Sequence, residues 1–428
     1  MITNNYFVKK WRASKKISWA LIFLLITSGS LASKLHGQEM DSLTIKIGQM
    51  ILIGMPKAEV DSAVLHEVAT GKAGSIILFE KNIPKTNSYA GLKKMIWTYQ
   101  KAAPIPLFVS IDQEGGKVNR LKEKYGFPRS ITAAASGKAK TLDSVRFYAG
   151  STASTLAGLG FNVNFAPCVD VAINPDNTVI VKVERSFSAN EDTVTMMARE
   201  YVREHRKAGV ITSLKHFPGH GSSKEDTHFG VADVTNTWSE RELKPYQSLL
   251  TLGEVDAIMT SHIVNKNLDK SGLPGTLSRE IIDGVLRKRL GFQGVVFSDD
   301  MQMHAITKQY GMEESIRLAI NAGVDILCFS NNIQGSEQRT VDKVHATIRG
   351  FVESGQISKA RIDESFRRIM KLKKQLMYTA SDYRMELSKA RLENSQYKNT
   401  VALNLAEMKR LTEELEKSKK KKRKRDKK

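Results

Sequence analysis

Short apolar runs recur along the chain, and segments with helical periodicity separate them. The runs are rich in β-branched residues and almost continuously apolar, which is typical of parallel strands buried on both faces. Eight such runs are predicted to be strands: residues 50–54, 74–79, 107–112, 163–169, 210–215, 257–262, 294–299 and 324–329. Amphipathic helices are predicted between the later runs, for example over 280–290 and 314–322.

Eight alternating β and α units predict an α/β fold of the (β/α)₈ TIM-barrel type over residues 38–376, with enlarged loops. A helix containing Ile362, Phe366 and Ile369 is expected to close the barrel near residue 376. The alternative is a doubly wound open sheet. That fold more often has a glycine-rich phosphate loop after its first strand, and the sequence shows none there.

The N-terminal segment has the pattern of an export signal. Basic residues up to Lys16 precede an apolar run at 17–26, and small residues follow it. The apolar run is shorter than the roughly 20 residues of a spanning helix, so residues 1–37 are predicted to be a cleaved signal peptide. A short uncleaved membrane anchor is the alternative. The protein is therefore expected to be exported, to the periplasm or the extracellular space.

The C-terminal segment, residues 377–428, differs from the barrel in composition. It is polar and helix-favouring, and its last twelve residues contain ten Lys or Arg. Much of the formal net charge of +21 therefore lies at the chain ends, and no specific nucleic acid partner is expected. The tail is expected either to be solvated or to contact an anionic membrane or cell-wall polymer.

The chain has two cysteines, Cys168 and Cys328. Export would permit a disulfide between them. However, they fall in the fourth and eighth predicted strands, on opposite sides of a barrel. Two free, buried thiols are therefore predicted.

Ionisable residues stand at the C-terminal ends of several predicted strands, among them Asp112, Lys215, His262 and Asp299. In a barrel these strand ends meet at one mouth, where barrel enzymes have their active sites. The densest group is the sequence KHFPGHG at 215–221, followed by EDTH at 225–228. We therefore expect the chemistry of the protein at this mouth.

Three kinds of chemistry are compatible with that dense group. His216 and His220 have the spacing of a helical metal site, but Pro218 and Gly219 would break the helix, so no metal or other cofactor is expected. Ser222 and Ser223 would suit a serine hydrolase, but the chain has no G-x-S-x-G motif. The third is acid/base catalysis.

Asp226 and His228 are the residues expected to perform acid/base catalysis. A carboxylate two residues from a histidine can orient the imidazole and stabilise its charged form. Asp299 would then be the opposing carboxylate, suited to attack on a sugar carbon.

The segment 215–221 together with 226–228 resembles the signature of glycoside hydrolase family 3, in its β-N-acetylglucosaminidase branch. Three further segments agree: Ile111–Leu121, Glu184–Phe187 and Phe297–Met301. The resemblance extends over about residues 42–376 and excludes both ends. Ser222-Ser223 and Val181-Lys182 depart from the usual pattern of the family without removing a motif residue.

The resemblance implies a retaining double displacement on a glycan that contains N-acetylglucosamine. Asp299 would be the nucleophile, and His228, held by Asp226, the general acid/base. Asp300 would have a supporting role and His220 a structural one. Sugar binding would involve Asp112, Arg120, Arg185, Lys215 and His216.

Two other functions stay open. Family 3 β-glucosidases and β-xylosidases usually have a second domain that supplies the acid/base, and the chain after 376 is too short and polar for one. A non-catalytic sugar- or wall-binding barrel would not need Asp226, His228 and Asp299. Peptidoglycan fragments, chitin oligosaccharides and similar glycans are all possible substrates, and the acceptor could be water or phosphate.

Overall fold

The computed structural model describes residues 41–139, 141–224, 230, 232–333 and 341–376. The predicted signal peptide (1–37) and C-terminal extension (377–428) lie outside the described residues. No helix within the described ranges is long and apolar enough to span a bilayer.

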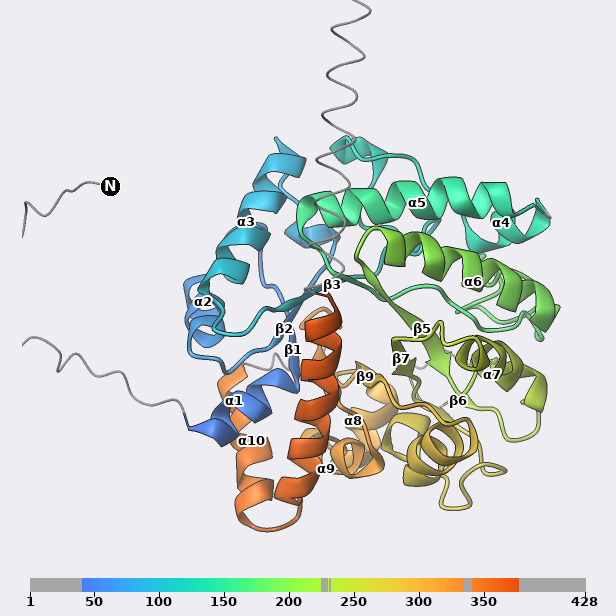
Figure 1. Cartoon of the computed structure of the whole chain (residues 1–428). Helices are drawn as coiled ribbons and strands as arrows, with labels where there is room; N and C mark the ends of the chain where they lie inside the picture. Colours follow the sequence, from blue (N-terminus) through green and yellow to red (C-terminus); the bar gives the residue numbers. More distant parts are fainter. Residues whose placement is uncertain (1–40, 140, 225–229, 231, 334–340, 377–428) are drawn as a thin grey trace, which may run out of the picture. The chain divides into compact units, whose positions relative to one another are not determined.

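Eight parallel strands close into one barrel, which confirms the predicted (β/α)₈ fold (Figure 1). Around the barrel the strand order is β1-β10-β9-β7-β5-β4-β3-β2. The strands are β1 (Ile51–Gly54), β2 (Ser75–Leu78), β3 (Phe108–Ile111), β4 (Val163–Asn164), β5 (Ile211–Phe217), β7 (Ala257–Thr260), β9 (Val295–Asp300) and β10 (Ile326–Phe329). A separate two-stranded sheet joins β6 (Ala232–Asp233) to β8 (Ile263–Val264).

Most of the strands are one or two residues shorter than predicted, and the differences in β4 and β5 affect the site. The run at 163–169 forms only the two-residue strand β4, because Pro167 has no N–H to continue the ladder. A single bridge between Cys168 and Lys215 follows it. In contrast, β5 continues to Phe217, which pairs with Thr260. His216 and Phe217, which lie beyond the predicted strand, are therefore strand residues, as Lys215 is.

Helices surround the strands, as Figure 1 shows. They are α1 (Ser42–Gln49), α2 (Ser62–Ala69), α3 (Ser88–Ala102), α4 (Ala133–Lys138), α5 (Leu142–Leu159), α6 (Glu191–Lys207), α7 (Lys244–Thr251), α8 (His304–Tyr310), α9 (Met312–Ala322) and α10 (Val341–Glu353). The helix predicted over 280–290 is a π-helix, η5 (Glu280–Arg289). The predicted closing helix is present over 359–376.

The barrel interior is filled by aromatic and aliphatic side chains. Phe297 contacts Phe108 and Phe165 edge to face, with ring centres 6.1 and 5.1 Å apart. At the end where the strands begin, buried Lys373 lies over the Phe108 ring and donates to the carbonyl of Gly74. This contact ties the 359–376 helix across the closed end of the barrel, so the opposite end remains as the mouth.

Both cysteines are free and buried, as predicted. Cys328 lies in β10 and Cys168 just after β4.

Candidate active site

Three of the expected site residues lie where the barrel strands end. Asp112 directly follows β3, Lys215 is in β5, and Asp299 is the next-to-last residue of β9. Burial raises the pKa of the Cys328 thiol well above its ordinary value, and the nearby charges of Asp300, Asp112 and Asp299 raise it further. Asp299 and Asp112 stand at the C-terminal ends of β9 and β3, which lie opposite each other in the closed barrel.

A buried chain of ion pairs runs across this region. Lys215, which is only 2% exposed, has its Nζ 2.8 Å from Asp112 Oδ1 and 2.6 Å from Glu114 Oε1. Burial opposes the charge on Lys215, but the two carboxylates outweigh it and raise the pKa. Attraction to Arg185 and Lys215 likewise overcomes burial and holds the pKa of Glu114 below its ordinary value. All of these groups are therefore charged at neutral pH.

Arg185 continues the chain on the far side of Glu114. Its Nε and Nη2 donate to the two carboxylate oxygens of Glu114 at 2.9 and 2.8 Å, the fork geometry that suits guanidinium and carboxylate. Nη1 donates to the carbonyl of Val179, and Nη2 also lies 3.1 Å from Nε2 of His216. Four polar contacts thus fix the orientation of Arg185.

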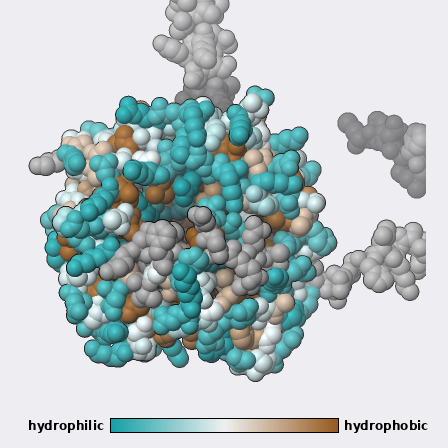
Figure 2. Space-filling view, turned by 180° about the vertical axis from the view of Figure 1, so that it is seen from behind, coloured by the Kyte–Doolittle hydropathy of each residue, from teal (hydrophilic) through white to brown (hydrophobic). Residues whose placement is uncertain are grey.

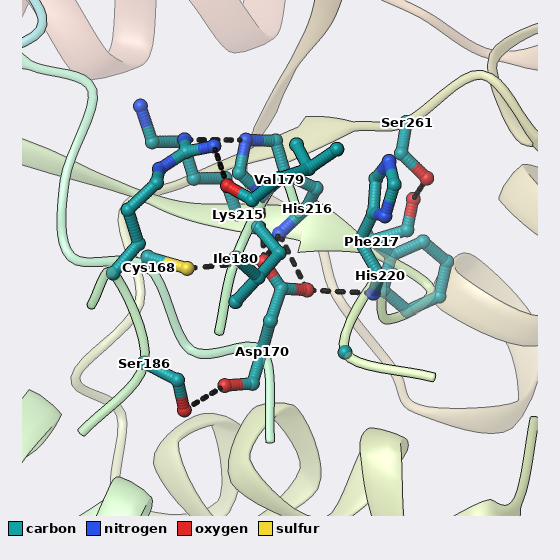
Figure 3. A network of polar contacts seen from close by, with 12 residues as sticks. Cys168, Asp170, Val179, Ile180, Ser186, Lys215, His216, Phe217, His220 and Ser261 are labelled. Atoms are coloured by element: carbon teal, nitrogen blue, oxygen red, sulfur yellow. Dashed lines mark hydrogen bonds and ion pairs between the residues drawn. The ribbon is translucent and has the colours of Figure 1, made fainter. Parts of the chain in front are cut away.

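Asp170 holds the other side of His216 (Figure 3). Its Oδ2 lies 2.7 Å from Nδ1 of His216, and its Oδ1 accepts the backbone N–H of His220 at 2.7 Å. The thiol of Cys168 donates to Oδ2 at 3.0 Å. Burial by itself would raise the pKa of Asp170, but the imidazole and the other donors hold it well below its ordinary value.

Arg120 lies at the other end of the chain of charges. Its Nη2 is 3.5 Å from Oδ2 of Asp112, and its guanidinium lies over the ring of Phe79. The structure thus brings together all five residues expected to bind sugar: Asp112, Arg120, Arg185, Lys215 and His216.

Asp299 and Asp300 have different surroundings. Asp300 is buried, accepts from the hydroxyl of Ser330 and from the backbone N–H of Gln302, and burial raises its pKa to about 6. Asp299 is less buried, and its Oδ1 accepts the backbone N–H of Asp300. The more accessible carboxylate is the one better placed to meet a substrate.

The region around His220 does not suit a serine hydrolase. Ser223 Oγ lies 2.6 Å from His220 Nδ1, but both residues are almost fully buried and the hydroxyl also donates to the His220 carbonyl. Burial lowers the pKa of His220 to about 4, so the ring is neutral. This pair supports the loop instead of meeting a substrate.

One group of the described residues has donor atoms close enough for a metal ion, namely Cys168, Asp170 and His216, all within 4.8 Å. Burial raises the pKa of the Cys168 thiol well above its ordinary value, so the thiol keeps the proton that it donates to Asp170. The cationic Arg185 lies at the other nitrogen of His216. The donors are therefore used by hydrogen bonds within the protein, and the residues do not fit a metal site.

The predicted acid/base pair, Asp226 and His228, lies outside the described residues. Conversely, Glu114 and Asp170 were not among the residues expected at the site. Both had a signal in the sequence, since Glu114 comes two residues after Asp112 in the same motif. Asp170 directly follows an apolar run, as Asp112 does.

Comparison with known proteins identifies the family. The model of the glycosyl hydrolase family 3 N-terminal domain matches residues 42–372. Beta-hexosaminidase A of Pseudoalteromonas piscicida is 33% identical over 323 residues, 71% of this chain and 53% of that protein. The beta-hexosaminidase of Tolumonas auensis is 31% identical over 291 residues, 67% of this chain and 84% of that protein.

A solved structure gives the same result. The glycoside hydrolase family 3 beta-N-acetylglucosaminidase from Paenibacillus sp. str. FPU-7 has a TM-score of 0.72 and 33% identity, covering 79% of this chain and 63% of that one. The chain thus spans only about half of the Pseudoalteromonas relative and under two thirds of the Paenibacillus protein. The matched segment nevertheless includes every strand of the barrel, and the chain belongs to glycoside hydrolase family 3.

Proposed function

We propose that this protein is an exported, retaining β-N-acetylglucosaminidase. It removes non-reducing terminal N-acetylglucosamine from peptidoglycan fragments, chitin oligosaccharides or similar glycans. The observation that supports the proposal is the barrel geometry, in which β9, the strand of Asp299, lies opposite β3, the strand that leads into the Lys215–Asp112–Glu114 cluster. The names of the relatives, beta-hexosaminidase and beta-N-acetylglucosaminidase, support the choice of sugar.

The proposed reaction has two displacements. Asp299 attacks the anomeric carbon, the glycosidic oxygen leaves with a proton from His228, and water then hydrolyses the glycosyl-enzyme. Asp226 orients His228. A histidine in this role avoids a second negative charge beside the nucleophile, which would raise the pKa of Asp299.

The cationic cluster has a binding role in the proposal. Lys215 Nζ has three hydrogens and two carboxylate partners, so one hydrogen remains for a sugar hydroxyl. Asp112, 16% exposed at its side chain, offers acceptor lone pairs toward the mouth. Charge-assisted hydrogen bonds of this kind are roughly twice as strong as neutral ones.

The test is hydrolysis of nitrophenyl N-acetyl-β-glucosaminide compared with the β-glucoside. We expect turnover of the first only, with the β-anomer as the first product in NMR spectra. Asp299→Asn should lower kcat by about a thousandfold or more. The amide cannot form the glycosyl-enzyme, and the remaining contacts to the substrate cannot substitute for that step. Asp300→Asn is the neighbouring control and should mainly lower stability. Equal rates of Asp299→Asn and wild type would refute the proposal.

A further inference from the structure

The outer surface of α3 (Ser88–Ala102) carries an alternating row of aromatic and basic residues. Residues four positions apart are neighbours on a helix surface, so the following four residues form one ridge: Tyr89, Lys93, Trp97 and Lys101. Lys94 is exposed beside them. The opposite side of the helix packs on the barrel through buried Leu92, Met95, Ile96 and Tyr99.

The aromatic rings of this ridge are unusually accessible. Trp97 is 60% exposed and Tyr89 is 45% exposed. Each ring has a lysine one turn further along, with Lys101 Nζ 4.9 Å from the centre of the Trp97 ring and Lys93 Nζ 5.9 Å from that of Tyr89. Large apolar surfaces and positive charges are thus presented together and outward. Figure 2 shows the molecule from the side opposite to that in Figure 1. On that face hydrophilic residues predominate, and hydrophobic residues are scattered among them.

The stretch of sequence that contains the ridge carries charge of one sign. Residues 81–111 contain five lysines and no Asp or Glu. An anionic partner is therefore complementary to it. Trp and Tyr rings concentrate at the level of lipid headgroups, and lysine can lie along apolar surface while its ammonium reaches phosphate. A polymer of neutral N-acetylglucosamine would match the rings but not the lysines.

We propose that the α3 ridge (Tyr89, Lys93, Lys94, Trp97 and Lys101) docks the barrel onto an anionic phospholipid surface. The rings enter the headgroup layer, and the lysines bind lipid phosphates. One helix face with three lysines gives reversible adsorption that weakens at high salt. The proposal does not depend on the glycosidase activity.

The experiment compares two triple variants of the full chain. Lys93→Gln/Lys94→Gln/Lys101→Gln removes the ridge lysines. The matched control, Lys359→Gln/Lys371→Gln/Lys374→Gln, removes three exposed lysines from the 359–376 helix and leaves both chain ends unchanged. Thermal unfolding establishes that both variants fold.

Binding is measured by co-sedimentation with vesicles of mixed phosphatidylcholine and phosphatidylglycerol. An exposed lysine near an anionic bilayer contributes about fivefold, so the ridge variant should bind about a hundredfold more weakly. The control should change by less than about threefold. Equal losses in the two variants would mean general electrostatic attraction and would overturn the proposal.

Trp97 supplies a local readout that binding through the chain ends does not produce. Brominated phospholipids should quench part of the tryptophan emission of wild type, and this part should disappear in Trp97→Phe. Identical quenching in wild type and Trp97→Phe would overturn the proposal. A change in Trp97 emission with N-acetylglucosamine oligomers, and none with vesicles, would also overturn the proposal and would make the ridge a glycan-binding surface.

Discussion

Asp170 and Arg185 hold His216 from opposite sides, with Oδ2 of Asp170 2.7 Å from Nδ1 and Nη2 of Arg185 3.1 Å from Nε2. A guanidinium can only donate, so Nε2 accepts and the ring proton is on Nδ1. A doubly protonated ring would direct an N–H at Arg185. In this arrangement His216 positions Arg185. Both ring nitrogens of His216 are hydrogen-bonded, Nδ1 to Asp170 and Nε2 to Arg185.

Asp170→Asn should disturb this arrangement. The amide keeps the shape of the side chain but removes the charge that fixes the His216 proton, so Arg185 loses its support. We expect kcat/KM for the N-acetylglucosaminide to fall at least about tenfold, and the free energy of unfolding by about 3 kcal/mol. Steady-state kinetics and urea unfolding measure the two effects.

The control for Asp170→Asn is Asp325→Asn. Asp325 is equally buried and binds Arg287, Arg361 and Arg368 at the other end of the barrel. The Asp325→Asn variant should lose about as much free energy of unfolding as Asp170→Asn, and its KM should equal that of wild type. If both variants lose activity in proportion to stability, Asp170 has no positioning role.

Glu114→Gln should weaken sugar binding. Glu114 pairs with both Lys215 and Arg185. The neutral amide leaves these two buried cations close together without the charge that separates them. Lys215 then loses the contact that orients its ammonium group for binding sugar. We expect kcat/KM to fall about 10- to 100-fold. Glu80→Gln is the comparison. Glu80 pairs with Lys122 and Lys124 but is 32% exposed at its side chain, and its loss should cost less than about threefold.

Glu242 should make stability depend on pH. Burial raises its pKa to about 8, while Oε2 accepts the N–H of Gly221 at 2.7 Å. Since the folded pKa exceeds the unfolded value near 4.5, its contribution is fully present below about pH 4.5 and is lost as pH rises through about 8. The loss amounts to at most about 5 kcal/mol.

Glu242→Gln removes this titration and keeps an acceptor for Gly221. Urea unfolding at pH 5 and pH 8 should therefore show a smaller decrease for the variant than for wild type. Parallel decreases in the two proteins would assign the pH dependence to other groups, such as Asp300.

Neither cysteine should react in the folded protein. Burial raises the pKa of both thiols well above the ordinary value, so little thiolate is present and reagents have no access. Iodoacetamide labelling followed by mass spectrometry should find two modified cysteines after unfolding in denaturant and none before it. Labelling of Cys168 under native conditions would show that the interior beside Asp170 opens.

The pattern of apolar runs was enough to predict the barrel, because strands buried on both faces need near-continuous apolar sequence. It could not set strand lengths. Pro167 shortens β4 because it has no N–H to donate, whereas pairing with Thr260 extends β5 beyond Lys215 to His216 and Phe217. Hydrogen bonding to the adjacent strand determines where a strand ends. The apolar pattern of one strand carries no information about that pairing.

The sequence by itself determined the fold class, the resemblance to family 3 and the ionisable residues that end the strands. Only the tertiary structure decided which of them touch. Glu114 and Asp170 became site residues because the pairing of neighbouring strands brings the ends of β3 and β5 and the segment after β4 together, so charges distant in the sequence meet where water is excluded. Charges that are buried must be paired, and the folded chain alone determines the pairs.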